Sequence, residues 1–429
     1  MPGLGAVERA KKGNAMTVRE EILNQIDLER DKIIALCSNM VKTPSENPPG
    51  DTRAICQLIT TFLESKGLSY RIHAPQEKMP NIVAHFAGKK PGRRLVFNGH
   101  MDVYPAGDPK RWCRHPFSGD VEDGKIFGRG SSDMKGGVTA SVMAFAYLAQ
   151  HQNRLKGEAV LTLVSDEETG GRWGSSWLLE NVPLVHGDVF LNGEPSSCEL
   201  ISFAEKGRVW LEVEAIGLGA HGAYTHMGDN AIQKMLYFLK DLERVKDLNM
   251  ITPTDVARVL EEGRQVVDAM KGKGATDVLM GITVNFGMIS GGTKINLVAE
   301  YCRAEVDIRL PQGVPVQKML EQIDQKVSRH PGIRYRILHE SDPFYTSPDH
   351  EIFVRLRKNA EAIKEGPVFL SSGIGGTDAK HFRKYNIPCA IYGPRSYNMG
   401  GPDEYITVED LILATKVQTV TALEYLGVE

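Results

Sequence analysis

The stretch Leu95-Val-Phe-Asn-Gly-His-Met-Asp102 decides the fold class of this chain. In it, a short apolar run leads directly into polar residues, and the same pattern returns in Ala159–Val164 before Ser165-Asp-Glu-Glu168 and in Val189–Leu191 before Asn192-Gly-Glu194. The alanine-rich stretch Met134–Gln150, between the first two runs, favours a helix. Continuous apolar runs separated by helical patterns are typical of buried strands in a parallel sheet. We therefore expect an α/β fold.

Four acidic or imidazole side chains follow the predicted strands at the point where each strand ends. They are His100, Glu167, Glu168 and Glu194. In open α/β sheets, ligands bind beyond the carboxyl ends of the strands. The sequence therefore predicts a functional site at this edge of the sheet.

The segments that flank this core are predicted to be helical at both ends of the chain. The apolar spacing of Thr17–Val41 indicates one helix, which the proline-rich turn Thr43–Gly50 ends. A second helix is expected over Asp51–Lys66, and residues 1–16 are expected to form a disordered tail. Near the other end, Cys389–Tyr392 favours a strand and the following Val408–Leu426 a closing helix.

The pattern of apolar and polar residues changes in the middle of the chain, which indicates an inserted α+β domain. Alternating or apolar runs predict strands, and helical spacing predicts helices, in the order β-α-β-β-α-β. The segments are Val209–Ala215, Asn230–Val245, Ile282–Ile289, Glu300–Arg309, Val316–His330 and Tyr335–His339. We expect this domain to span residues 207–341, between parts 17–206 and 342–429 of a catalytic domain. The polar segment Met250–Lys273 is expected to be loosely packed.

Bulk composition excludes several classes of partner. The chain has 51 Lys and Arg against 54 Asp and Glu, which gives a net charge of −3. It therefore has no excess of basic residues with which to bind nucleic acid or an anionic membrane. No stretch approaches the roughly 18–20 apolar residues of a membrane span. Residues 1–14 lack the apolar region of a secretory signal, and the six cysteines are scattered singly. We expect a cytoplasmic protein.

Four residues have the chemistry of metal ligands: His100, Asp133, Glu168 and Glu194. Imidazole nitrogen and carboxylate oxygen suit divalent zinc, manganese or cobalt, and one carboxylate can bridge two ions. Asp102 lies two residues after His100, on the same side of a strand, and is expected to orient the imidazole. Beside Glu168, Glu167 is expected to act as general base on a metal-activated water. Each pair alone is common on protein surfaces, but their joint occurrence at strand ends favours a site.

Six motifs carry a resemblance to a known enzyme family. They are Asn98-Gly-His-Met-Asp102, Phe127-Gly-Arg-Gly-Ser-Ser-Asp-Met-Lys-Gly136, Asp166-Glu-Glu-Thr-Gly170, Gly193-Glu-Pro-Ser196, Ala220-His-Gly-Ala-Tyr-Thr-His226 and Gly375-Gly-Thr-Asp378. From about Thr17 onward, the chain resembles the co-catalytic metallopeptidases and deacylases that include succinyl-diaminopimelate desuccinylase, acetylornithine deacetylase, glutamate carboxypeptidase and aminoacylase. Six motifs in order make the resemblance specific.

The resemblance implies a role for each matching residue. His100 and Glu194 would bind one metal, Asp133 would bridge, Glu168 would serve a second metal, and Glu167 would be the base. His221 would reach the active site of a partner subunit and stabilise an oxyanion, so the inserted domain would be both lid and dimerisation domain. Asn296 and Arg309 would contact a carboxylate of a small-molecule substrate.

The sequence departs from the family at its last metal ligand. The family has a histidine just before a Pro-[Asp/Asn]-Glu segment, whereas here Gly400 or Gly401 stands at that place. Two alternatives follow. Either one metal binds at His100, Asp133 and Glu194, or an unusual partner such as Asn398, Asp403 or His381 completes a second site. For His381, an ordinary helix position is the favoured interpretation.

Three functions remain open at this point. The leading one is hydrolysis of an amide, either deacylation of an N-acylated amino acid or removal of a terminal residue. A second is hydrolytic deamination, which would release ammonia from an aromatic amine at a one-metal site. The third is a binding protein that has lost turnover, and the retention of Glu167 weakens it.

Overall fold

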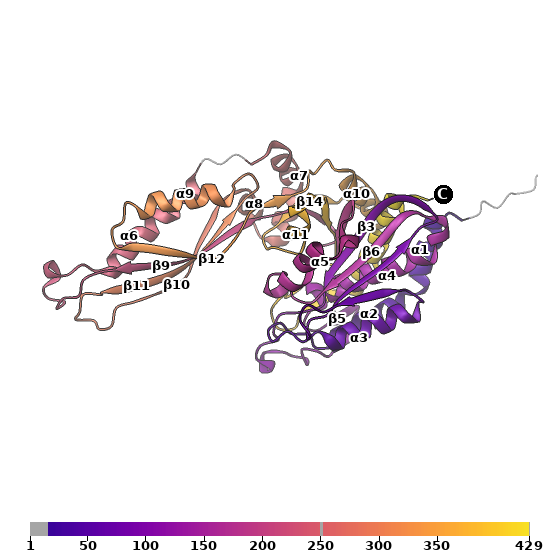
Figure 1. Ribbon diagram of the computed structural model, residues 1–429, viewed down its shortest axis with the longest axis horizontal. Coiled ribbons are helices and arrows are strands. Elements are labelled where there is room, and N and C mark those ends of the chain that lie inside the picture. The colour runs from indigo at the N-terminus through magenta and orange to yellow at the C-terminus, as the bar shows by residue number, and fades with distance from the viewer. Residues whose placement is uncertain (1–15, 249–251, 429) are drawn as a thin grey trace, which may run out of the picture.

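The computed structural model describes residues 16–248 and 252–428. Of the expected tail, only Met16 falls inside this range. The described chain forms two lobes, a large one around a nine-stranded sheet and a smaller one around a separate four-stranded sheet (Figure 1). None of the described helices is both long and apolar enough to cross a membrane.

The central sheet has the order β1-β2-β6-β3-β7-β15-β8-β13, and β14 pairs with β8. Its middle strands β6, β3, β7 and β15 are parallel, as the apolar runs predicted, but β1, β2 and β13 add antiparallel pairs, so the sheet is mixed. The bounds are β1 (Tyr70–His73), β2 (Asn81–Ala87), β3 (Lys90–His100), β6 (Lys156–Val164), β7 (Val189–Asn192), β8 (Leu200–Glu205), β13 (Phe344–Tyr345), β14 (Phe369–Gly373) and β15 (Cys389–Ile391). A small sheet joins β4 (Val121–Glu122), β5 (Lys125–Phe127) and β16 (Tyr405–Thr407).

Helices cover both faces of the central sheet because its strands are apolar on both sides. Along β3, Leu95 and Phe97 pack in one core, while Val96 packs in another. The first core is covered by α1 (Val18–Leu28), α2 (Arg30–Lys42), α3 (Arg53–Ser65), α4 (Gly136–Gln150), α10 (Glu351–Lys364) and α12 (Val408–Leu426). The second is covered by α5 (Trp177–Asn181) and α11 (Ala379–Lys384). This three-layer arrangement confirms the α/β class.

The first predicted helix is in fact two helices. At Glu29 the backbone has φ −99° and ψ 15°, which is not helical, and α1 and α2 meet there. Ile26 and Ile33 nevertheless both reach the same core. Because the apolar spacing runs on through the break, the sequence pattern could not reveal it.

The smaller lobe contains the expected β-α-β-β-α-β order. Its sheet has the order β10-β11-β9-β12 with every pair antiparallel. The strands are β9 (Gly207–Ile216), β10 (Thr283–Gly291), β11 (Tyr301–Leu310) and β12 (Ile333–Ser341), and α6 (Ala231–Glu243) and α9 (Val316–Val327) cover one face. The other face carries charged side chains and no covering helix among the described residues.

The expectation that Met250–Lys273 is loosely packed is wrong for its described part. This part holds α7 (Thr254–Lys271), and α8 (Ala275–Met280) follows it. Val256, Leu260 and Val267 of α7 pack in the core of the large lobe. The charged residues of α7 made the segment read as polar, but its apolar residues form a narrow stripe at helical spacing. Such a stripe is enough to pack one face of the helix against the core. The domain limits at 207 and 341 remain a prediction.

Candidate metal centre and active site

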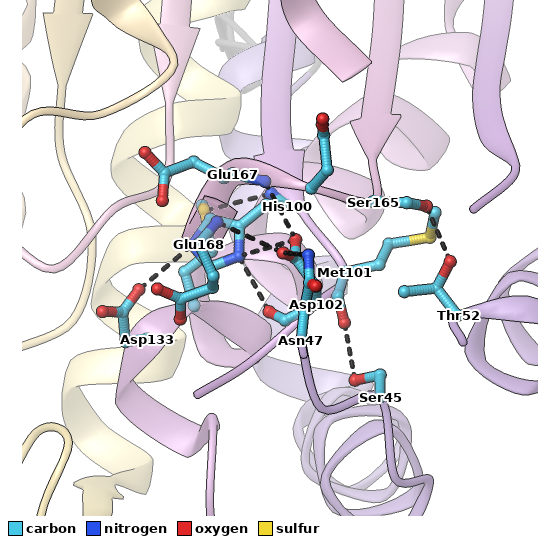
Figure 2. Close-up of polar contacts among 12 residues, drawn as sticks. Ser45, Asn47, Thr52, His100, Met101, Asp102, Asp133, Ser165, Glu167 and Glu168 are labelled. Atoms are coloured by element: carbon cyan, nitrogen blue, oxygen red, sulfur yellow. Dashed lines mark hydrogen bonds and ion pairs between the residues drawn. The ribbon is translucent and has the colours of Figure 1, made fainter. Parts of the chain in front are cut away.

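Three side chains from separate segments converge at the carboxyl edge of the central sheet. His100 ends β3, Glu194 lies two residues beyond β7, and Asp133 comes from the turn that precedes α4. The Nε2 atom of His100 lies 3.1 Å from Oδ1 of Asp133 and 3.3 Å from Oε1 of Glu194. One ligand atom from each lies within 4.8 Å of the others. Figure 2 shows the contact between His100 and Asp133.

The electrostatics of this cluster favour a bound cation. His100 is 1% exposed and Glu194 is 7% exposed. Burial raises the pKa of Glu194 to about 8, and the neighbouring Asp133 carboxylate adds to the rise. A divalent cation would offset this repulsion, and one imidazole nitrogen with two carboxylate oxygens is a donor set that zinc accepts. The residues therefore fit a divalent metal.

Asp102 holds the imidazole through its backbone and not mainly through its carboxylate. Nδ1 of His100 lies 2.8 Å from the Asp102 carbonyl oxygen and 3.5 Å from its carboxylate. With Nδ1–H donating to that carbonyl, Nε2 is left free to face the cluster. The carboxylate instead accepts the backbone N–H groups of Glu167 (3.3 Å) and Glu168 (3.2 Å) and the side-chain amide of Asn47 (2.9 Å), as Figure 2 shows. Asp102 thus links His100 to the turn after β6.

The two adjacent glutamates have different surroundings. Oε1 of Glu167 lies 3.7 Å from Nζ of Lys380, a residue that the sequence did not single out. Burial raises the pKa of Glu167, and the Lys380 ammonium opposes that rise. Burial also raises the pKa of Glu168, to about 10, with repulsion from Asp133, and its Oε1 has no hydrogen-bond partner in the described chain. Glu168 lies beside the three-residue cluster but is not part of it.

A buried ion pair, which the sequence did not reveal, holds the Asp133 turn. Oε1 of Glu404 accepts hydrogen bonds from the backbone N–H (3.0 Å) and hydroxyl (2.8 Å) of Ser132 and from the Asp133 N–H (3.2 Å). The other carboxylate oxygen pairs with Arg129, which also donates to the Gly400 carbonyl at 2.9 Å. Both residues belonged to noted segments, but 275 positions separate them, and no spacing rule links such distant charges.

Among the described residues, no further His, Cys, Asp or Glu joins the cluster of His100, Asp133 and Glu194 in place of the missing histidine ligand. A Cβ atom added at Gly400 would have nothing within 4 Å, and its φ is +74°. Of the alternatives, the Asn398 amide donates to the Asp403 carbonyl at 3.3 Å, and Nε2 of His381 lies 3.1 Å from the Gly170 carbonyl. Neither His381 nor Asp403 joins the cluster.

The remaining sequence-predicted site residues lie on the smaller lobe, at its two ends. His221 and Asn296 are exposed on loops at the outer end, where the Gly222 N–H donates to the Asn296 carbonyl at 2.7 Å. Arg309 lies at the inner end and contacts the Ile374 carbonyl of the large lobe at 3.4 Å. The ten residues of β9 separate the two ends by about 30 Å. His221 and Asn296 therefore do not gather with His100 within one chain.

Comparisons with known proteins find relatives that match most of this chain. A family model described as peptidase family M20/M25/M40 matches residues 96–424. A Staphylococcus epidermidis protein named probable succinyl-diaminopimelate desuccinylase is 28% identical over 389 residues, covering 88% of this chain and 93% of its own. The M20 family metallo-carboxypeptidase Sso-CP2 from Sulfolobus solfataricus shares the fold, with a TM-score of 0.74, 18% identity and coverage of 91% and 98% of the two chains. Human carnosine dipeptidase 1 does so with a TM-score of 0.71, 15% identity and coverage of 96% and 99%.

Proposed function

Because the chain belongs to peptidase family M20/M25/M40, we propose that it cleaves the carbon–nitrogen bond of a small N-acyl amino acid or peptide-like amide in a metal-dependent hydrolysis. The observation that carries the proposal is the meeting of His100, Asp133 and Glu194 beside Glu167. Three ligands with an adjacent carboxylate base are the parts that hydrolysis by activated water needs.

His100, Asp133 and Glu194 would hold one divalent ion, for which zinc, manganese and cobalt are the candidates. When bound, such an ion lowers the pKa of a water molecule and polarises the scissile carbonyl. Glu168 would be the main protein ligand available for a second ion beyond the shared Asp133. Because Gly400 and Gly401 offer no ligand atom, we favour a site with one tightly held ion.

Glu167 would act as the general base. Its carboxylate takes one proton from the attacking water and passes it to the nitrogen that leaves. The water oxygen bonds to the carbonyl carbon, the carbon–nitrogen bond breaks, and a carboxylate and an amine are released. Lys380 favours the ionised form of Glu167, and the Asp102 carboxylate fixes the backbone from which Glu167 projects.

A homodimer formed through the smaller lobe would complete the site. His221 is exposed about 30 Å along β9 from the inner end of that lobe, which supports a role in a second copy and not in its own chain. It would stabilise the developing oxyanion there. Asn296 and Arg309 would contact a substrate carboxylate. Mixing His221→Ala chains with Glu167→Gln chains should restore part of the activity that each lacks alone, whereas no restoration would contradict shared sites.

A panel of small amides tests the proposed reaction. The panel contains N-succinyl amino acids and dipeptides, which the names of the relatives suggest, and N-acetyl amino acids. Each compound would be incubated with enzyme and each of the three metals. We expect release of a primary amine together with a carboxylate. Release of ammonia from aromatic amines, with no amide cleavage, would contradict the proposal and favour the deaminase. Ligand binding without turnover under every metal would favour the binding protein.

A further inference from the structure

Trp210 lies on the open face of the smaller sheet, near the inner end of that lobe. Its neighbours along β9, Val209 and Leu211, point into the core beneath α6 and α9, which lie along one side of the sheet (Figure 1). Because successive side chains of a strand alternate, the indole points to the opposite face, where Trp210 is 37% exposed. A single exposed apolar residue is ordinary, so its surroundings decide what it does.

The indole is held in place by the side chains around it. The guanidinium carbons of Arg208 and Arg309 lie 5.3 Å and 5.8 Å from the ring centroid, within the range of cation–π contacts. His339 of β12 stands directly opposite Trp210, with the two ring centroids 5.7 Å apart. The register of β12 shifts between Ile337 and His339, and such bulges re-aim a side chain. Trp210 and His339 thus form an aromatic pair on the open face.

The aromatic pair lies on the side of the smaller lobe that faces the proposed base. A Cβ atom added at Gly376, in the loop before α11, would lie 3.2 Å from Nη2 of Arg208. Lys380 of α11 contacts Glu167 at 3.7 Å. Burial lowers the pKa of His339, and the cations of Arg208 and Lys380, one from each lobe, add to the effect. His339 is therefore uncharged at neutral pH, so the pair offers two neutral rings.

Farther out, the same face carries ion pairs. Glu212 pairs with Arg303 and with Arg336, and Arg334 pairs with Glu214 at 2.6 Å. Charged groups that already have partners gain nothing from an apolar neighbour and would lose water to it. An apolar group that enters from the side of Glu167 would therefore meet the two rings first and would gain little by reaching beyond them.

We propose that Trp210 and His339 receive an aromatic or large apolar group of the amide substrate and so determine specificity. The inference rests on the proposed hydrolysis and narrows its substrates to amides that carry such a group on the acyl or the amine side. Contact with the rings removes apolar surface from water, and ring-on-ring contacts add to this gain. If the indole served only to pack the two arginines, its loss would affect all substrates alike.

Binding of two compound series tests the aromatic pair without depending on turnover. Both start from N-acetylglycine. One enlarges the acyl group to butyryl and benzoyl, and the other enlarges the amino acid to leucine and phenylalanine. Metal-loaded Glu167→Gln protein is titrated by calorimetry, alone and combined with Trp210→Ala, Trp210→Phe, His339→Ala or Tyr301→Ala. Tyr301 is the control because it is 41% exposed on the same face, at the outer end of β11, where its hydroxyl donates to Glu214 at 2.7 Å.

We expect the protein with Glu167→Gln alone to bind the benzoyl or the phenylalanine compound more tightly than N-acetylglycine, and the series that shows this preference identifies the side. Trp210→Ala should weaken binding of the preferred compound at least about 10-fold and leave N-acetylglycine unchanged. Trp210→Phe keeps a ring and should lose less, and His339→Ala should lose part of the preference.

Four results would overturn the proposal: no preference in either series, no loss in the Trp210 and His339 variants, an equal loss for N-acetylglycine, or the same selective loss in Tyr301→Ala. Selective binding with no hydrolysis in the amide panel would keep the aromatic pair as a binding site and reject the proposed reaction.

Discussion

The Nδ1 atom of His100 lies 2.8 Å from the backbone carbonyl oxygen of Asp102, closer than the 3.5 Å to the Asp102 carboxylate. One residue therefore does two things with two different groups. Its carbonyl orients the imidazole, and its carboxylate accepts two backbone N–H groups of the turn that carries Glu167 and Glu168. Asp102 thus joins the cluster around His100 to Glu167, the proposed base.

Asp102→Asn separates these two tasks. The carbonyl that orients His100 remains, but the amide replaces a charged acceptor of two N–H groups, so the turn that carries Glu167 should shift. We expect kcat to fall at least about 10-fold, since small misplacements of a catalytic group are costly. Metal affinity, measured by calorimetry, should fall much less. An equal fall in affinity and in kcat would show that the carboxylate itself orients the imidazole.

Glu404→Gln tests the buried pair behind Asp133. The change leaves Arg129 buried without its counter-charge, which typically costs about 3–5 kcal/mol. Urea unfolding should show a loss of this size, and the affinity for the metal should fall because the Asp133 N–H loses a charged acceptor. Glu409→Gln is the control, since Glu409 pairs with Arg30 on the surface with its side chain 80% exposed. A variant as stable as this control would contradict the account.

Glu194 and Glu168 should differ in their effect on metal binding. Loss of an outer hydrogen-bond partner of a metal ligand already costs about 10- to 100-fold in affinity, so loss of a ligand should cost at least as much. We therefore expect Glu194→Gln to weaken binding of one ion more than about 100-fold. Glu168→Gln should change it little. Two tightly bound ions in the parent protein, one of them lost in Glu168→Gln, would contradict the one-ion site.

His381 should make the protein sensitive to acid. Burial lowers its pKa to about 3, with the cations of Lys380 and Lys384 adding to the effect, whereas an unfolded histidine has a pKa near 6.5. The folded state thus prefers neutral His381, and its contribution to stability is present above pH about 6.5 and lost as the pH falls toward 3.

His381→Gln should remove this contribution. Urea unfolding in the presence of a chelator would compare the two proteins between pH 7 and pH 4. The free energy of unfolding of the parent should fall more steeply, by up to about 1.4 kcal/mol per pH unit, the slope for one proton. Parallel curves would show that His381 takes up its proton equally in both states.

Short-range sequence patterns predicted the site residues that lie at the ends of strands. Apolar runs locate β3, β6 and β7. His100 is the last residue of β3, and Glu167 and Glu194 lie within three residues of the ends of β6 and β7, so sheet geometry brings them to one edge. Asp133 follows no predicted strand, and the sequence pointed to it through its carboxylate chemistry and its place in the motif Phe127–Gly136.

Long-range pairing could not be predicted in this way. The pair of Arg129 with Glu404 and the contact of Lys380 with Glu167 join positions far apart in the chain. The two roles of Asp102 depend on whether its carbonyl oxygen or its carboxylate lies closer to the imidazole of His100. No residue pattern specifies this.

The metal content of the purified protein tests the central claim most directly. After loading with zinc, manganese or cobalt and removal of excess, elemental analysis would be made of the parent, His100→Ala and Glu167→Gln. The account predicts a tightly bound divalent ion in the parent and in Glu167→Gln, its loss in His100→Ala, and hydrolysis only in the parent. A parent protein that retains no divalent ion, or a Glu167→Gln variant that hydrolyses amides as fast as the parent, would contradict it.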